Sequence, residues 1–103
     1  MSRPIRLALL HEIISDDTTV FDYGCGHGDD ITRLARRGIK AGGWDPHHKP
    51  NAKRQLANVV NLGYVLNVIE DPIEREQTLR QAWKLARNVL VVSARLDYEL
   101  DDA

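Results

Sequence analysis

The chain has 103 residues, of which 43% are hydrophobic and 28% are charged, and this balance predicts one soluble globular domain and excludes a disordered tail. Its 14 basic and 15 acidic residues give a formal net charge of -1 at pH 7, so no global field indicates a nucleic-acid-binding or membrane-binding protein. A single cysteine excludes a disulfide scaffold and predicts a reducing, cytoplasmic location, and we expect neither a membrane span nor a signal peptide.

The first half of the chain predicts helices that alternate with strands. A proline in the first turn and apolar residues at helical spacing predict a helix over Pro4–Ile14. The β-branched and aromatic run Thr18–Tyr23 predicts a buried strand that stops at a glycine. A second helix is expected over Asp29–Arg37, ended by a left-handed Gly38, and a second strand over Ile39–Trp44.

The second half repeats this alternation after a polar, basic loop at His47–Leu56, where we expect at most one helical turn after Pro50. A third strand is expected over Asn58–Tyr64. Asp71 is an N-cap followed by proline, so it predicts the start of a helix that continues to Arg87. The apolar run Asn88–Ala94 predicts a strand covered on both faces. We expect the helix to bury four residues: Leu79, Ala82, Trp83 and Ala86.

Strands that alternate with helices imply right-handed βαβ units and a parallel sheet, so the expected class is α/β. We expect one domain over residues 1–96 and an acidic tail over residues 97–103. The charges are segregated along the chain. The tail carries Asp97, Glu99, Asp101 and Asp102, whereas the middle carries Arg33, Arg36, Arg37, Lys40, Lys49, Lys53 and Arg54.

Three glycines at alternate positions follow the first strand, at Gly24, Gly26 and Gly28. Gly24 permits a tight turn, and Gly26 lets a ligand approach the backbone without meeting a Cβ. The helix that follows offers free N–H groups and a partial positive charge. In a doubly wound sheet a nucleotide-like ligand binds at this position. A purely structural turn is the alternative interpretation.

Two acids accompany the glycines. Asp45 lies 23 residues after Asp22, at the end of the next strand, where a carboxylate can accept both hydroxyls of a ribose. Asp22 itself precedes the first glycine by two residues. Its charge would repel the diphosphate of a dinucleotide such as NAD, whose folds prefer G-x-G-x-x-G, but would attract a cationic amino acid. The sequence therefore favours a nucleoside ligand that carries a positive charge.

This D-x-G-x-G-x-G pattern resembles motif I of the Rossmann-like S-adenosylmethionine (SAM) methyltransferases. The string F-D-Y-G-C-G-H-G-D-D, then G-W-D-P and N-L-G-Y-V-L-N-V-I-E-D-P, is most similar to the methyltransferases associated with DNA phosphorothioation, over nearly all of the chain except the tail. The resemblance implies a three-layer Rossmann-like sandwich and SAM as cofactor, with S-adenosylhomocysteine as product. It implies these cofactor-binding residues: Asp22, Gly24, Cys25, Gly26, Gly28, Asp45, Pro46, Asn61 and Leu62.

The chain is shorter than the family's pattern. About a dozen residues separate Asp45 from the next strand, too few for the usual third strand and its helices, and the last two strands are also missing. We therefore expect a minimal sheet of about four strands, ordered 2-1-4-5 by the family's numbering. The apolar strand Val89–Val92 would be an exposed edge, which predicts a homo-oligomer that covers it. A SAM-binding module without its own activity, acting in a larger protein or assembly, is the alternative to an enzyme.

The candidate catalytic residues are Asn61 and Tyr64. Asn61-Leu62-Gly63-Tyr64 resembles, at its first and last positions, the [DNS]-P-P-[YF] motif of enzymes that methylate amino groups of nucleic acids. There the amide or acid accepts a hydrogen bond from the exocyclic amine, and the aromatic ring stacks on a flipped base. The alternative is that Asn61 satisfies backbone groups and Tyr64 packs.

Nucleic acid, either DNA or RNA, is accordingly an expected acceptor. Lys49, Lys53 and Arg54 leave the ligand-facing end of the sheet and could contact its phosphates. The basic residues of Arg33–Lys40 are interpreted as a solvated helix face. No metal is expected, because the histidines and Cys25 lack metal-ligand spacing. Trp44 and Trp83 are expected in the core.

Overall fold

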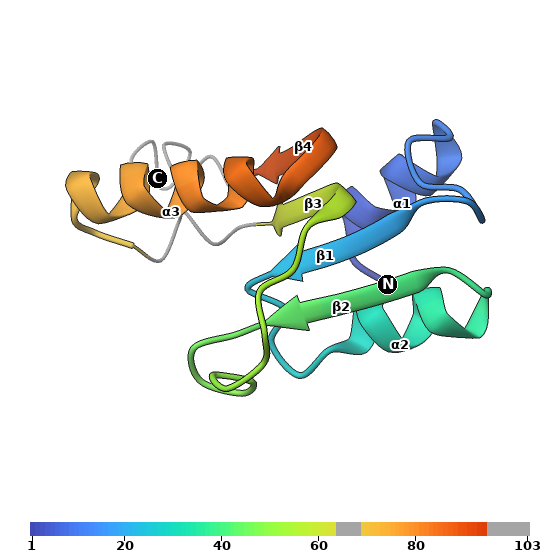
Figure 1. The fold of residues 1–103 in the computed structure, drawn as a ribbon, viewed down its shortest axis with the longest axis horizontal. Coiled ribbons are helices and arrows are strands. Elements are labelled where there is room, and N and C mark those ends of the chain that lie inside the picture. The colour runs from blue at the N-terminus through green and yellow to red at the C-terminus, as the bar shows by residue number, and fades with distance from the viewer. Residues whose placement is uncertain (64–68, 95–103) are drawn as a thin grey trace, which may run out of the picture.

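The computed structural model describes residues 1–63 and 69–94, so Tyr64 and the acidic tail lie outside the described residues. The four strands form one sheet in the order β2-β1-β3-β4, and each neighbouring pair is parallel (Figure 1). The predicted α/β class with a four-stranded parallel sheet is confirmed. The elements are α1 Arg3–Leu10, β1 Thr19–Tyr23, α2 Asp29–Arg36, β2 Lys40–Trp44, β3 Ala57–Gly63, α3 Pro72–Leu85 and β4 Ala86–Ser93.

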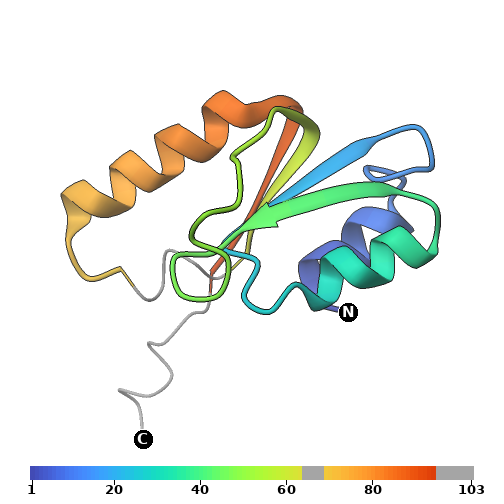
Figure 2. The same cartoon turned by 60° about the horizontal axis from the view of Figure 1, so that its bottom comes forward.

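The helices cover both faces of the sheet. The step from β1 to β2 and the step from β3 to β4 run in opposite directions across the sheet, so right-handed crossovers place α2 and α3 on opposite faces. Figure 2 shows α1 and α2 together on one face and α3 on the other. In the described part of the chain, no helix has the length and hydropathy needed to cross a membrane.

Each face of the sheet has its own hydrophobic cluster, because successive residues of a strand point to opposite sides. Val20 and Val59 pack under α1 and α2, whereas their neighbours Phe21 and Val60 pack under α3. The first cluster contains Ile5, Ala8, Ile14, Val20, Leu34, Ile39 and Val59. The second contains Phe21, Tyr23, Ala57, Val60, Leu62 and Ala82.

Helix α1 is shorter than predicted, because it ends at Leu10 and not at Ile14. Glu12 takes the left-handed conformation, with φ of 60°, and the N–H groups of Ile13 and Ile14 both donate to the carbonyl of Ala8. This closure reverses the chain so that Ile14 is buried in the core while Ile13 stays partly exposed. A non-glycine residue supplies the helix stop, which sequence patterns do not indicate.

The other helix boundaries follow the predicted signals more closely. Gly38 has a φ of 82° directly after α2, as expected for the residue that ends it. The Asp71 side chain accepts a hydrogen bond from the N–H of Ile73 at 2.9 Å, so it caps α3 as predicted. After β2 the chain folds back, with the Lys49 N–H donating to the Asp45 carbonyl at 3.0 Å. Around Pro50 it forms a single turn, in which the Ala52 N–H donates to the Lys49 carbonyl at 3.3 Å, and no helix follows.

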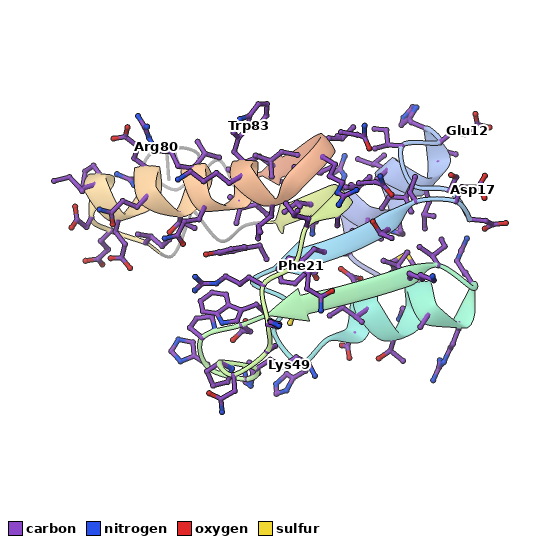
Figure 3. The ribbon with its side chains drawn as sticks, in the orientation of Figure 1. Glu12, Asp17, Phe21, Lys49, Arg80 and Trp83 are labelled. Carbon is purple, nitrogen blue, oxygen red and sulfur yellow. The ribbon has the colours of Figure 1, made fainter. Side chains whose placement is uncertain are left out.

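The expected burial of α3 is largely wrong. Among the four residues expected to face inward, Ala82 alone is buried, and Trp83 is 68% exposed and points away from the sheet (Figure 3). Helix α3 packs mainly on β3 and β4, and from β1 the Tyr23 hydroxyl donates a hydrogen bond to Gln81 at 2.7 Å. A narrow sheet buries one strip of the helix and leaves its flanks uncovered, which explains the exposure of Trp83.

One close approach depends on Gly43 in β2. A Cβ placed there would collide with the Ile31 side chain and would lie 2.8 Å from Cys25 Cβ and 2.9 Å from the backbone oxygen of Asp22. A Cβ on the neighbouring Gly42 would meet only Phe21, at 3.9 Å. Gly43 therefore allows α2 and the glycine loop to lie directly against the sheet.

We predict that Gly43→Ala destabilises the chain by about 2–3 kcal/mol, because the backbone oxygen of β1 cannot move away. Gly42→Ala is the matched control and should change the free energy of unfolding by less than about 1 kcal/mol in either direction. Urea denaturation followed by circular dichroism measures both. Equal midpoints for the two variants would contradict the packing described for Gly43.

Candidate functional site

The candidate site lies at the carboxyl ends of β1, β2 and β3. Between β1 and β3 the chain changes direction across the sheet, and such switch points bind ligands in open α/β sheets. Asp22 of β1 and Asn61 of β3 are register partners at this point. The glycine loop that follows β1 covers them.

The glycine loop uses the conformational freedom of its three glycines. Gly24, Gly26 and Gly28 have φ values of 90°, 57° and 89°. The N–H groups of Gly24 and Cys25 both donate to the carbonyl of Trp44, at 2.7 and 2.9 Å, which fastens the loop to β2. A Cβ on Gly26 would meet nothing within 4 Å, so the space in front of this residue is open to a ligand. Gly28 is the N-cap of α2.

Asp45 ties the glycine loop to the segment after β2. Its Oδ2 accepts the N–H of Gly26 at 2.8 Å, and its Oδ1 accepts the N–H groups of His47 and His48 at 2.8 and 3.0 Å. Burial acts to raise the pKa of Asp45, but these backbone hydrogen bonds hold the pKa below its ordinary value. The residue predicted to bind a ribose therefore already holds three backbone donors.

Asp22 is a buried carboxyl group with one hydrogen-bond donor in the described structure. It is 6% exposed, and the Asn61 amide donates to it at 3.1 Å. Burial raises the pKa of Asp22 to about 6, against the lowering effect of the Asn61 hydrogen bond, and the nearby charges of Asp30 and Asp45 raise it further. In the described part of the chain, no basic side chain forms an ion pair with Asp22.

Asn61 offers a second unsatisfied acceptor beside Asp22. Its side chain is 2% exposed, and its Oδ1 has no hydrogen-bond partner among the described residues. Buried oxygens without donors are costly, so both groups favour a ligand that carries N–H donors and a positive charge. They open into a cavity of about 210 Å³, lined by Ser2, Pro4, Asp22, Gly24, Cys25, Gly26, Asp30, Asn61 and Gly63.

A larger cavity of about 760 Å³ lies on the other side of Gly24, between the β2 end and α3. Gly24 lines both cavities, so they meet at the glycine loop. The larger cavity contains the predicted cofactor residue Pro46 and two aromatic rings that sequence reasoning did not assign to a site, Tyr23 and Trp44. The rings pack 5.2 Å apart, and the Arg54 guanidinium lies 4.2 Å from the centre of the Trp44 ring. Tyr23 and Trp44 are the last residues of β1 and β2. This position at the carboxyl ends of two predicted strands is the sequence signal that could have identified them.

The remaining predicted site residues are dispersed. Cys25 lines the smaller cavity, and burial together with the Asp22 and Asp45 charges raises the pKa of its thiol. The Leu62 side chain is fully buried in the core under α3. Lys49 lies over the glycine loop, with its Cε 3.1 Å from the position of a Cβ on Gly28 (Figure 3). Lys53 is exposed.

The rings of His27 and His48 contact each other, with centres 3.8 Å apart, beside the hydrogen bonds that Asp45 makes to both segments. Neither residue belongs to a larger set of metal ligands: within residues 1–63 and 69–94, no three His, Cys, Asp or Glu side chains converge on a metal position. The contact between the two rings joins the glycine loop to the segment that follows β2.

Comparison with known proteins gives no relative for this chain. No family model matches it, and neither a curated protein nor a solved structure shows a significant match. The functional interpretation therefore depends on the chemistry of the Asp22–Asn61 cavity.

The raised pKa of Asp22 predicts a specific pH dependence of stability. Its value is about 6 in the folded chain against 3.8 ordinarily, so the folded state holds the extra proton between these values. Stability from this group is complete below pH 3.8 and is lost as the pH rises through about 6, by about 3 kcal/mol.

We expect Asp22→Asn to remove this loss and to raise the free energy of unfolding at pH 8 by up to about 3 kcal/mol. Urea denaturation of both proteins from pH 4 to pH 8 measures the difference. Parallel curves for the two proteins would contradict the burial of a charged Asp22.

Proposed function

We propose that the chain is a minimal, Rossmann-like SAM-dependent methyltransferase. The observation that carries the proposal is the pair of buried acceptors at the switch point: the Asp22 carboxylate and the Asn61 oxygen. SAM carries an ammonium group and a sulfonium cation, and the ammonium would supply the positive charge missing at Asp22 and a donor for the Asn61 oxygen. The resemblance of the glycine loop to motif I supports the same ligand. In the proposed correspondence β3 and β4 are the family's fourth and fifth strands.

The charge around the glycine loop favours SAM over NAD. Asp30 and Asp45 both add negative charge at Asp22. A diphosphate at this loop would meet three carboxylates, whereas a ligand with a net positive charge is attracted by them. The dinucleotide alternative is therefore the weaker one.

The two cavities fit the two halves of SAM. We assign its methionine end to the 210 Å³ cavity and its adenosine to the 760 Å³ cavity, with Gly24 between them. Pro46 and Trp44 are the apolar wall for the adenine. A ribose that binds Asp45 at both hydroxyls would displace the Gly26 N–H, because the carboxylate has about four acceptor positions and three are filled.

When bound, SAM supplies a methyl group on a sulfonium, which transfers by in-line displacement with little covalent help from protein. The chain's task is then to hold SAM and the acceptor in line. We propose Asn61 and Tyr64 as the residues nearest the acceptor, and DNA or RNA as its class. Lys49, Lys53 and Arg54 are proposed phosphate contacts, and the cytoplasm, where Cys25 stays reduced, is the proposed location.

We predict that SAM and S-adenosylhomocysteine bind the chain. Asp22→Asn should lower the affinity for SAM at least about tenfold, because a charge-assisted hydrogen bond is lost. Affinity for SAM should also fall below about pH 6, where Asp22 takes up a proton. Asp45→Ala should weaken binding strongly, because it removes the proposed acceptor of the ribose hydroxyls. Isothermal titration calorimetry measures each affinity.

Asp16→Asn is the matched control for this experiment, because it removes one exposed carboxylate in the turn before β1, at the opposite end of the sheet. Its affinity for SAM should stay within about twofold of the parent. Absence of binding heat and of any thermal shift with both ligands would overturn the proposed function.

A SAM-binding module without activity is the second candidate. It is favoured by the burial of Asn61, whose amide is committed to Asp22 and is 2% exposed. Incubation with methyl-labelled SAM and a panel of DNA, RNA and protein acceptors separates the two candidates. We expect transfer to nucleic acid that is lost in Asn61→Ala at saturating SAM. Binding without transfer to any acceptor would favour the module.

The open edge of the sheet supports the proposal of a homo-oligomer. Among the described strands β4 pairs with β3 alone, and a groove of about 420 Å³ runs between β4 and α1. Leu7, Ile13 and Val92 line this groove and are exposed. Light scattering of the full chain measures the mass. We expect at least a dimer, and a strictly monomeric chain would contradict this part of the proposal.

A further inference from the structure

A groove on the side of the sheet opposite α3 contains arginines from two helices. It has a volume of about 510 Å³ and lies between α1 and α2, which share this face (Figure 2). Arg6 comes from α1, and the other three arginines from α2 and its C-cap. All four are exposed. We call it the arginine groove; its lining is Met1, Arg6, Arg33, Arg36 and Arg37.

The arginine groove has no acidic residue in its lining. The described residues contain a single salt bridge, between Arg80 and Glu76 on α3, so none of the four guanidinium groups is paired with a described carboxylate. Four like charges around one depression repel each other, and an anion in the groove relieves this repulsion. The chain as a whole has a net charge of -1, so the positive field is a local property.

The arginine groove adjoins the candidate site. A cavity of about 290 Å³ shares Met1 and Arg33 with the groove, and it shares Ser2, Cys25 and Asp30 with the cavity at Asp22 and Asn61. Asp29 and Asp30 also line this connecting cavity, so we expect the phosphates of a ligand to stay on the arginine side while its bases face the candidate site.

We infer that the arginine groove binds the phosphodiester backbone of a nucleic acid, and this inference rests on the proposed function because it names the acceptor that the site receives. Guanidinium groups match phosphate oxygens in bidentate geometry. Arg33 and Arg37 are one helical turn apart, about 6 Å along the axis, so the set is spread along a surface. A single small anion would use one or two arginines, whereas a polyanion uses all four.

The arginine groove does not include Lys49, Lys53 or Arg54, the loop residues that the sequence predicts to contact phosphates. The Arg54 guanidinium is stacked on Trp44, and the Lys49 side chain covers Gly28. These cations are partly engaged within the protein. The four arginines of the groove have no such contacts among the described residues, so they are the stronger phosphate site.

The test is fluorescence anisotropy of the full chain with a labelled 20-nucleotide single strand and with its duplex, between 50 and 200 mM salt. We expect Arg36→Gln/Arg37→Gln to weaken binding of the better ligand at least tenfold, and to reduce the slope of log affinity against log salt by about 1.4 for a single strand or 1.8 for a duplex. Arg6→Gln, from the other helix, should weaken binding about threefold.

Lys84→Gln/Arg87→Gln is the matched control, because it removes two exposed charges at the end of α3 and the start of β4. Its affinity should change less than twofold. Equal losses in both double variants would overturn the inference, as would a loss confined to Lys49→Gln/Lys53→Gln. No binding of either nucleic acid, or tighter binding of a labelled polyglutamate through the same arginines, would also overturn it.

The same variants separate this inference from the proposed function. Arg36 and Arg37 line neither of the cavities assigned to SAM, so the double variant should bind SAM as the parent does in calorimetry. If the double variant loses nucleic-acid binding and keeps SAM binding, the result supports nucleic-acid binding by the arginine groove. If the parent chain binds SAM but no nucleic acid, the inference about the arginine groove is wrong and the proposed SAM binding still holds.

Discussion

A buried carboxylate without a cation is the constraint on which the site depends. Parallel pairing of β1 with β3 places Asp22 opposite Asn61, and the glycine loop closes over both, so neither group reaches bulk water freely. The fold maintains this arrangement at the expense of stability at neutral pH, because the pKa of Asp22 is raised to about 6. Such a cost is typical of functional sites, and a cationic ligand would offset it.

The neighbouring acid has the opposite environment. Asp45 is surrounded by backbone N–H groups, which stabilise its charge and hold two loops together. Asp22 thus receives one hydrogen bond, from Asn61, whereas Asp45 receives three from backbone N–H groups. The first is poised for a ligand and the second organises the loop that receives it. Gly43 completes this arrangement by letting the glycine loop lie against β2.

The strands, the glycine loop and the start of α3 could be predicted because their signals are local: β-branched and apolar runs, a turn that favours glycine, and an N-cap at Asp71. Features that depend on packing across the molecule could not be predicted. The helix stop at Glu12, the exposure of Trp83 and the close approach at Gly43 each follow from how neighbouring elements meet. For the same reason, Arg6 joins the arginines of α2 only in the folded chain.

The most direct test of the central claim is the pKa of the Asp22 carboxyl itself, measured by carbon NMR titration with and without SAM. We predict a pKa of about 6 in the free chain and a lower pKa when SAM is bound, because the ammonium then lies against the carboxylate. The pKa of the Asp45 carboxyl should lie below its ordinary value in both titrations. An Asp22 pKa that is the same with saturating SAM as without it would contradict the account.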